Sequence, residues 1–135
     1  MLAMAAHLQG RVHALNVTDG SRAVMRMSSV AACRLLLEAG AEPVLQLACR
    51  DRNRIALQAD LLGAHALGIR NLLCLTGDPV RTGDQPEVRP VNELESVKLL
   101  QQVEALNQGE DPVKGSLPDG ATALFPGCAA DPHSR

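Results

Sequence analysis

Apolar residues along the chain alternate between short continuous runs and segments with helical spacing, and this alternation predicts strands and helices in turn. The continuous runs are typical of strands buried in a parallel sheet. The predicted strands cover 12–17, 43–49, 71–75 and 121–125. The predicted helices cover 2–8, the segment from Ser28 or Ser29 to Gly40, 55–67 and 93–107. Long polar loops are expected at 76–91 and 109–120.

The apolar positions of each predicted helix fall on one face, which is expected to pack against the sheet. Ser28 or Ser29 suits the N-cap of the second helix, and Gly40 and Gly68 suit the ends of the second and third helices. The predicted inward faces are Val30, Cys33, Leu36 and Leu37; Ile55, Ala59, Leu62 and Ala66; and Leu94, Val97, Leu100 and Leu106.

Strands that alternate with helices favour parallel pairing through right-handed crossovers, and therefore an α/β fold. Two architectures share this pattern, a doubly wound sheet and a (β/α)8 barrel. A complete barrel takes about 250 residues, so we expect this chain of 135 residues to be one partial TIM-barrel segment, 1–135, with about four parallel strands and crossover helices. Because open strand edges promote association, we expect a truncated frame, a split gene or an oligomer that closes the barrel.

Composition narrows the classes of function. The chain has one Phe, no Trp and no Tyr, and its formal net charge is −2, so it lacks the stacking platforms and the basic surface of nucleic-acid-binding proteins. No apolar run approaches the ~18 residues that span a bilayer, and the N-terminus does not resemble a signal peptide. We therefore expect a cytoplasmic protein without nucleic-acid or membrane partners.

The cysteines are expected to be core residues. Cys33, Cys49, Cys74 and Cys128 lie in apolar runs and lack the spacing of a zinc site. This pattern favours buried free thiols in a reducing compartment, and it predicts no metal site.

Residues directly after the predicted strands are the candidates for chemistry, because parallel α/β folds bind ligands at the carboxyl ends of their strands. Asp78 follows an apolar strand and Gly77. Its carboxylate either reaches a site beside the core, where it can face a developing positive charge, or belongs to a turn before Pro79. Thr18 and Asp19 are either cofactor ligands or part of a Thr-Asp-Gly turn.

Other polar residues have alternatives of their own. Gln46 lies within an apolar strand and points either to a ligand in the barrel centre or outward at a sheet edge. Arg50 and Asp51 are expected to pair at the surface with little energetic effect. His65 is expected to be a packed or surface residue of a helix. Neither GxGxxG nor GxxxxGK[ST] occurs, which excludes the dinucleotide fingerprint and the P-loop.

Several tracts of the sequence resemble a known family. HALNVTDGSRAVMRMSS and EPVLQLACRDRNRIALQADLLGAHALGIRNLLCLTGDP look like the second to fourth βα units of methylenetetrahydrofolate reductases, and GATALFPGCAADP is similar to the fifth strand and its loop. The resemblance implies a (β/α)8 barrel that binds FAD at the carboxyl ends of its strands. It also implies an enzyme of one-carbon metabolism, which takes a hydride from NAD(P)H and reduces methylenetetrahydrofolate to methyltetrahydrofolate.

The resemblance assigns roles by position. Thr76, Gly77 and Asp78 match the family's x-Gly-Asp, whose aspartate lies near the flavin and the folate and stabilises the cationic iminium form of the substrate. Asp78 is therefore the implied catalytic and substrate-binding residue. Asp131 stands where the family has a tyrosine that packs on the cofactor. The implied FAD-binding residues are Thr18, Asp19, Ser21, Gln46, Thr76, Gly77, Asp78, Glu93 and Asp131.

Two other functions stay open from the sequence. One is a non-catalytic barrel fragment that binds FAD or a partner chain, and the other is a different barrel enzyme that acts on a pterin or a phosphorylated substrate. The expected small-molecule partner is folate. The expected protein partner is a second copy of the chain or the remainder of the barrel.

The resemblance predicts little or no reductase activity for the 135-residue polypeptide alone. The family's general-acid glutamate belongs to a strand that would precede Met1, and this acid helps to open the substrate ring. The measurement is NAD(P)H oxidation by the purified polypeptide with FAD and methylenetetrahydrofolate. Turnover at ordinary enzyme rates would contradict the prediction.

Overall fold

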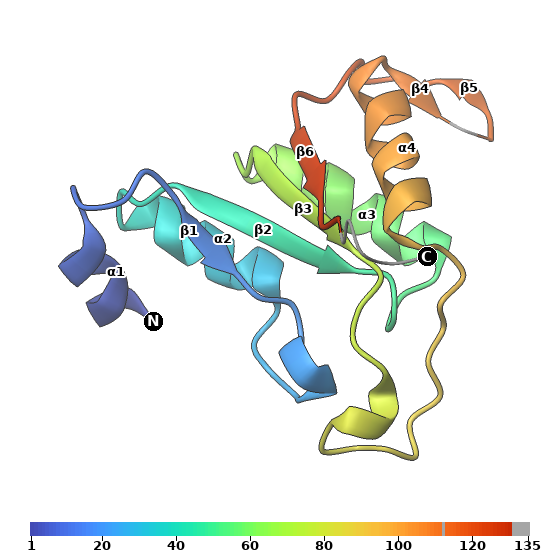
Figure 1. Ribbon diagram of the computed structural model, residues 1–135. Helices are drawn as coiled ribbons and strands as arrows, with labels where there is room; N and C mark the ends of the chain where they lie inside the picture. The colour runs from blue at the N-terminus through green and yellow to red at the C-terminus, as the bar shows by residue number, and fades with distance from the viewer. Residues whose placement is uncertain (112, 131–135) are drawn as a thin grey trace.

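The structure of the chain, a computed structural model, describes residues 1–111 and 113–130. Within these residues one parallel sheet has four strands in the order β1-β2-β3-β6 (Figure 1). Its strands are β1 (Leu15–Val17), β2 (Pro43–Ala48), β3 (Asn71–Leu75) and β6 (Phe125–Cys128). The α-helices are α1 (Leu2–Leu8), α2 (Ser29–Glu38), α3 (Arg54–Ala66) and α4 (Ser96–Asn107). Two short 3₁₀ helices, η1 (Ser21–Ala23) and η2 (Val80–Thr82), and a hairpin of β4 (Glu110–Asp111) and β5 (Gly115–Ser116) lie in the loops.

The crossover helices cover one face of the sheet. Because the strands follow one another across the sheet in chain order, right-handed crossovers place every connecting helix on the same side. Leu45 and Leu47 of β2 are fully buried in one core with Leu61 of α3, whereas Val44 and Gln46, which point the opposite way, are partly exposed. A doubly wound sheet has helices on both faces. The structure is therefore that of a barrel segment, and the predicted α/β fold with about four parallel strands is confirmed.

The buried face of α3 differs from the prediction. Residues with helical spacing, i, i+4 and i+7, form two apolar stripes on this helix, and periodicity alone does not say which stripe meets the sheet. The structure fully buries Leu57, Leu61 and Ala64. The predicted stripe is exposed instead: Ile55, Ala59, Leu62 and Ala66.

The other two helices agree better with their predicted faces. In α2, Cys33 and Leu36 are buried, and Val30 and Leu37 pack against the core. In α4, Leu106 is buried as predicted, but Val97 is 55% exposed. The core residues of α4 that the prediction missed are Leu99 and Val103.

The last strand begins later than predicted, at Phe125 instead of residue 121. The side chain of Asn107, at the end of α4, binds the preceding segment. Its Oδ1 accepts from the Leu124 N–H (3.0 Å) and the Thr122 hydroxyl (2.6 Å), and its Nδ2 donates to the Leu124 carbonyl (2.8 Å). These bonds satisfy backbone groups that a neighbouring strand would otherwise pair, so strand pairing starts only at Phe125.

Smaller corrections concern the loops and the first strand. Strand β1 starts at Leu15, which lies opposite Pro43, the first residue of β2. Residues 12–14 therefore pair with no strand in the part of the chain that the structure describes. The predicted loop 109–120 contains the β4–β5 hairpin. Among the described residues, no helix combines the length and the apolar character needed to cross a bilayer.

Three of the four thiols are buried, as expected. Burial raises the pKa of Cys33 and of Cys74 to about 12 and that of Cys49 to about 11. The expectation is wrong for Cys128, which is exposed. Cys128 is the last residue of β6, whose only strand partner within the described residues is β3, so few groups cover it.

Substitutions in α3 distinguish its two apolar stripes. We expect Leu61→Ala to lower the free energy of unfolding by about 2–5 kcal/mol, because it leaves a cavity in the core. Ile55→Ala is the matched control on the same helix and should change that free energy by less than about 0.5 kcal/mol. Urea unfolding followed by circular dichroism measures both values. Equal losses would mean that the helix is rotated relative to this structure.

Candidate functional site

At the carboxyl end of the sheet, the loops after β1 and β3 and the end of strand β2 border a cavity of about 390 Å³, called the rim cavity below. Its lining residues are Thr18, Asp19, Ser21, Gln46, Ala48, Leu75, Thr76, Gly77 and Asp78. The structure thus brings together the predicted site residues that directly follow β1 and β3, with Gln46 of β2. Of the two orientations left open for Gln46, the structure shows the inward one.

Asp78 links the loop after β3 to the loop after β1. Its Oδ2 accepts a hydrogen bond from the backbone N–H of Arg22 at 2.6 Å. Arg22 has a positive φ of 59°, which directs this N–H as part of the turn that forms η1. Among the described residues, the other oxygen of Asp78 accepts no hydrogen bond from a protein group. Asp78 therefore bonds to a segment 56 positions away in the sequence, whichever of the two predicted roles it has.

Asp19 has structural partners as well as a place in the cavity wall. One carboxylate oxygen accepts from the Ala48 N–H (2.9 Å) and from Nη1 of Arg52 (2.6 Å), and the other accepts from Nη2 of Arg52 (3.2 Å). Nε of Arg52 also lies 2.8 Å from Asp60 of α3. Burial acts to lower the pKa of Arg52, but the hydrogen bonds with Asp19 and the nearby carboxylates outweigh it and raise this pKa. Asp19 therefore fixes the loop after β1 to the end of β2.

Arg50 is not the surface residue that the sequence predicted. It is 5% exposed, and its guanidinium donates to the carbonyls of Gly20 (3.2 and 3.3 Å) and Asp78 (3.3 Å). It also donates to both carboxylate oxygens of Asp51, at 2.7 and 2.5 Å. This hydrogen bonding lowers the pKa of Asp51, whose side chain is 46% exposed. The pairing was predicted correctly, but the burial of Arg50 depends on how the three loops fold together and has no local signal in the sequence.

Other predicted residues lie at the edges of the site. The hydroxyl of Thr76 accepts from the Ser96 N–H at 3.2 Å and so caps α4. Glu93 does not line the rim cavity; its Oε2 accepts from the Arg54 N–H at the start of α3 (2.9 Å). Asp131 lies outside the described residues. Its predicted cofactor contact, and that of Glu93, stay predictions.

Three polar side chains of the rim cavity have free hydrogen-bonding groups. Within the described residues, no protein hydrogen bond is made by the hydroxyls of Thr18 and Ser21 or by the amide of Gln46. Ala48 and Leu75 supply an apolar surface between them. The rim cavity therefore combines an apolar patch with several convergent polar groups, and convergent polar groups are what fix the orientation of a bound small molecule or cofactor.

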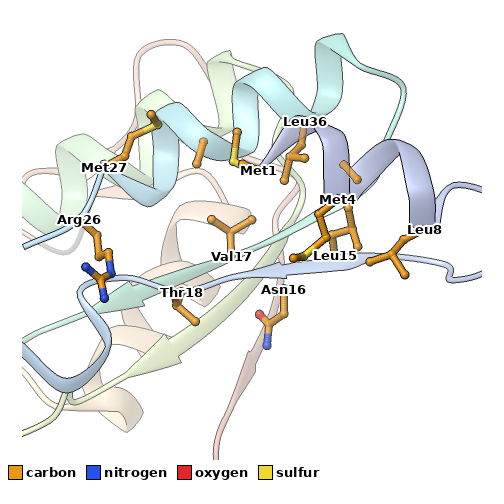
Figure 2. A pocket seen from close by; sticks show the side chains of 12 residues that line it. Met1, Met4, Leu8, Leu15, Asn16, Val17, Thr18, Arg26, Met27 and Leu36 are labelled. Carbon is orange, nitrogen blue, oxygen red and sulfur yellow. The ribbon is translucent and has the colours of Figure 1, made fainter. Parts of the chain in front are cut away.

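Two further pockets lie beside the rim cavity. One, of about 400 Å³, is on the other side of Gly77 and Asp78 and is lined by Arg50, Arg81 and prolines of the long loop. The other, of about 370 Å³, lies on the helix side of β1, between α1 and α2 (Figure 2). Figure 2 shows that apolar side chains such as Met4, Leu15 and Val17 dominate it. Within residues 1–111 and 113–130, no cluster of three His, Cys, Asp or Glu side chains has the arrangement of a metal site.

Parallel strands with helices on one face define a partial (β/α)-barrel, and the rim cavity lies at the carboxyl ends of the strands, where such barrels bind their ligands. The family model described as methylenetetrahydrofolate reductase matches residues 1–135, the whole chain. The chain therefore belongs to the methylenetetrahydrofolate reductase family, a family of TIM-barrel oxidoreductases. A comparison with characterised proteins found no significant match.

The pair of Arg50 and Asp51 predicts a dependence of stability on acid. Since the pKa of Asp51 is lower in the folded chain than in the unfolded chain, its ionised form stabilises the fold above the ordinary aspartate pKa of about 4, and this stabilisation is lost as the pH falls through the folded pKa. Because nearly half of the side chain is exposed, the contribution is at most about 1 kcal/mol. The free energy of unfolding should therefore fall less between about pH 6 and pH 3 in Asp51→Asn than in the unchanged chain.

Asp84→Asn is the control for this measurement, because Asp84 is exposed and makes no side-chain hydrogen bond or ion pair with the described residues. It should leave the acid dependence unchanged. If Asp51→Asn and Asp84→Asn behave alike, the pairing of Asp51 with Arg50 has no energetic effect.

Proposed function

We propose that the rim cavity binds the isoalloxazine ring of FAD, and that the chain serves the reduction of methylenetetrahydrofolate to methyltetrahydrofolate by NAD(P)H. Family membership supports an oxidoreductase of this type. The observation that carries the proposal is the convergence of Thr18, Gln46 and Asp78, from three separate strands, on one cavity of about 390 Å³.

The residues present fit a flavin ring. Such a ring has two apolar faces and an edge that carries hydrogen-bond donors and acceptors. Ala48 and Leu75 offer apolar contact, and the groups of Thr18, Ser21 and Gln46, which have no partner among the described residues, are free to bond the edge. When it is bound, FAD supplies the hydride chemistry, while the protein supplies position and charge.

Asp78 is the residue proposed to face the folate. Its Oδ2 is held by the Arg22 N–H, so the carboxylate has a fixed position at the mouth of the cavity. The side chain is exposed in this structure, and water weakens its field. A bound substrate displaces that water, and the fixed negative charge then stabilises positive charge that develops on the substrate.

We also propose that the chain works in the cytoplasm as a flavoprotein of one-carbon metabolism. Support for this compartment comes from the free thiols, because Cys33, Cys49 and Cys74 are buried without a disulfide and disulfides are rare in the cytosol.

A substitution that fills the cavity tests the proposal. Gln46→Trp places a large ring in the rim cavity and should weaken FAD binding at least about tenfold, which corresponds to about 1.4 kcal/mol. Val44→Trp is the matched control: Val44 lies on the same face of β2, two positions before Gln46, and does not line the cavity. It should bind FAD like the unchanged chain.

Equilibrium dialysis measures the binding of FAD directly. Fluorescence quenching is less suitable, because the unchanged chain has no Trp and no Tyr that could quench flavin emission by stacking. Two results would contradict the proposal. One is that the unchanged chain does not retain FAD. The other is that Gln46→Trp and Val44→Trp weaken binding equally, which would place the flavin elsewhere.

A further inference from the structure

The buried guanidinium of Arg50 has no role in the chemistry proposed above, although it lies next to the rim cavity. Its side chain is 6% exposed, and its hydrogen bonds reach across the loops. Nη1 donates both to Gly20, in the loop after β1, and to Asp78, in the loop after β3. Nε and Nη2 donate to Asp51 within its own loop.

The backbone of Arg50 also holds the far end of the long loop after β3. The carbonyl oxygen of Arg50 accepts from the N–H groups of Val91 (2.7 Å) and Asn92 (3.4 Å). Both the start of this loop, at Asp78, and its end therefore bond to the same residue.

Two glycines allow these loops to approach Arg50 closely. A Cβ atom on Gly77 would lie 2.8 Å from the Cβ of Arg50, and one on Gly20 would lie 2.7 Å from its Nη2. Both glycines have positive φ, 100° and 54°, a region that other residues rarely adopt. The absence of a side chain at Gly20 and Gly77 thus makes room for one residue, Arg50: Gly20 for its guanidinium and Gly77 for its Cβ.

We propose that Arg50 is the positioning residue of the rim cavity: it sets the separation of the loops that carry Thr18 and Asp78, and so directs both side chains into one space. That FAD is the ligand of this space rests on the proposed function, but the positioning role of Arg50 does not. A guanidinium suits this role because its planar fork donates several hydrogen bonds in fixed directions, whereas the ammonium of lysine is a flexible point charge.

The hydrogen bond from the Arg22 N–H to Asp78 reports on the separation of the two loops. Its amide proton resonance in the NMR spectrum should lie downfield, because the bond to a carboxylate is short, and Asp78→Asn provides the reference without that charge. In Arg50→Met the Arg22 resonance should move most of the way to its position in Asp78→Asn. In the double variant Arg50→Met/Asp78→Asn, the Arg22 resonance should lie close to its position in Asp78→Asn alone.

Two more variants keep this test decisive. Arg50→Lys retains the charge and should move the Arg22 resonance part of the way, which gives a result even if Arg50→Met fails to fold. Arg54→Met is the matched control, because the Arg54 side chain is exposed and makes no hydrogen bond with the described residues. It should leave the resonance in place. An unchanged Arg22 resonance in Arg50→Met and Arg50→Lys overturns the proposal. In Arg50→Lys, shifts at Leu45 and Leu47 as large as the shift at Arg22 also overturn it, since the change would then not be confined to the loops that Arg50 joins.

FAD binding separates this proposal from the proposed function. Arg50→Met should weaken FAD retention in dialysis at least about tenfold, while Arg54→Met should retain it. If the unchanged chain does not retain FAD but the Arg22 resonance responds as described, the flavin assignment fails and the positioning role stands. If FAD is retained equally by the unchanged chain and by Arg50→Met, and the Arg22 resonance does not move, the positioning role fails alone.

Discussion

The register of β2 between its two neighbours is the constraint on which the site depends. β2 pairs in parallel with β1 and with β3, and these pairings set Val17 opposite Leu45 and Ala48 opposite Leu75. Leu45 and Leu47 are fully buried on the helix side, so a slip by one residue would expose them and turn Gln46 into the core. Hydrophobic burial on one face of the sheet thus determines which polar groups reach the cavity on the other.

Most charged residues at the rim hold the loops in place, and one, Asp78, remains available to contact a ligand. Asp19 is paired with Arg52 and also accepts from the Ala48 N–H, whereas Asp51 is paired with Arg50, whose guanidinium donates to the backbone of two loops. Asp78 instead receives a single hydrogen bond, from a backbone N–H, and keeps an oxygen without a protein partner among the described residues. This arrangement leaves the Asp78 carboxylate available at the cavity mouth, as its proposed contact with a cationic substrate requires.

Local patterns predicted the order of the elements and most of the cavity lining, because parallel strands bring the residues after their carboxyl ends to one edge. Features that depend on contacts between distant segments were not predictable. The prediction of the buried stripe of α3 was wrong because two stripes have the same spacing. The predicted start of β6 was wrong because Asn107 binds the segment before it. The burial of Arg50 was missed for the same reason, since its partners Gly20 and Asp78 lie 30 and 28 positions away.

The most direct test of this account is a crystal structure of the chain grown with FAD. The account predicts the isoalloxazine ring in the rim cavity, with ring atoms within about 4 Å of Thr18, Gln46 and Asp78. A ring bound in the methionine-lined pocket between α1 and α2, shown in Figure 2, would contradict it. So would a ring bound against the long loop on the far side of Gly77.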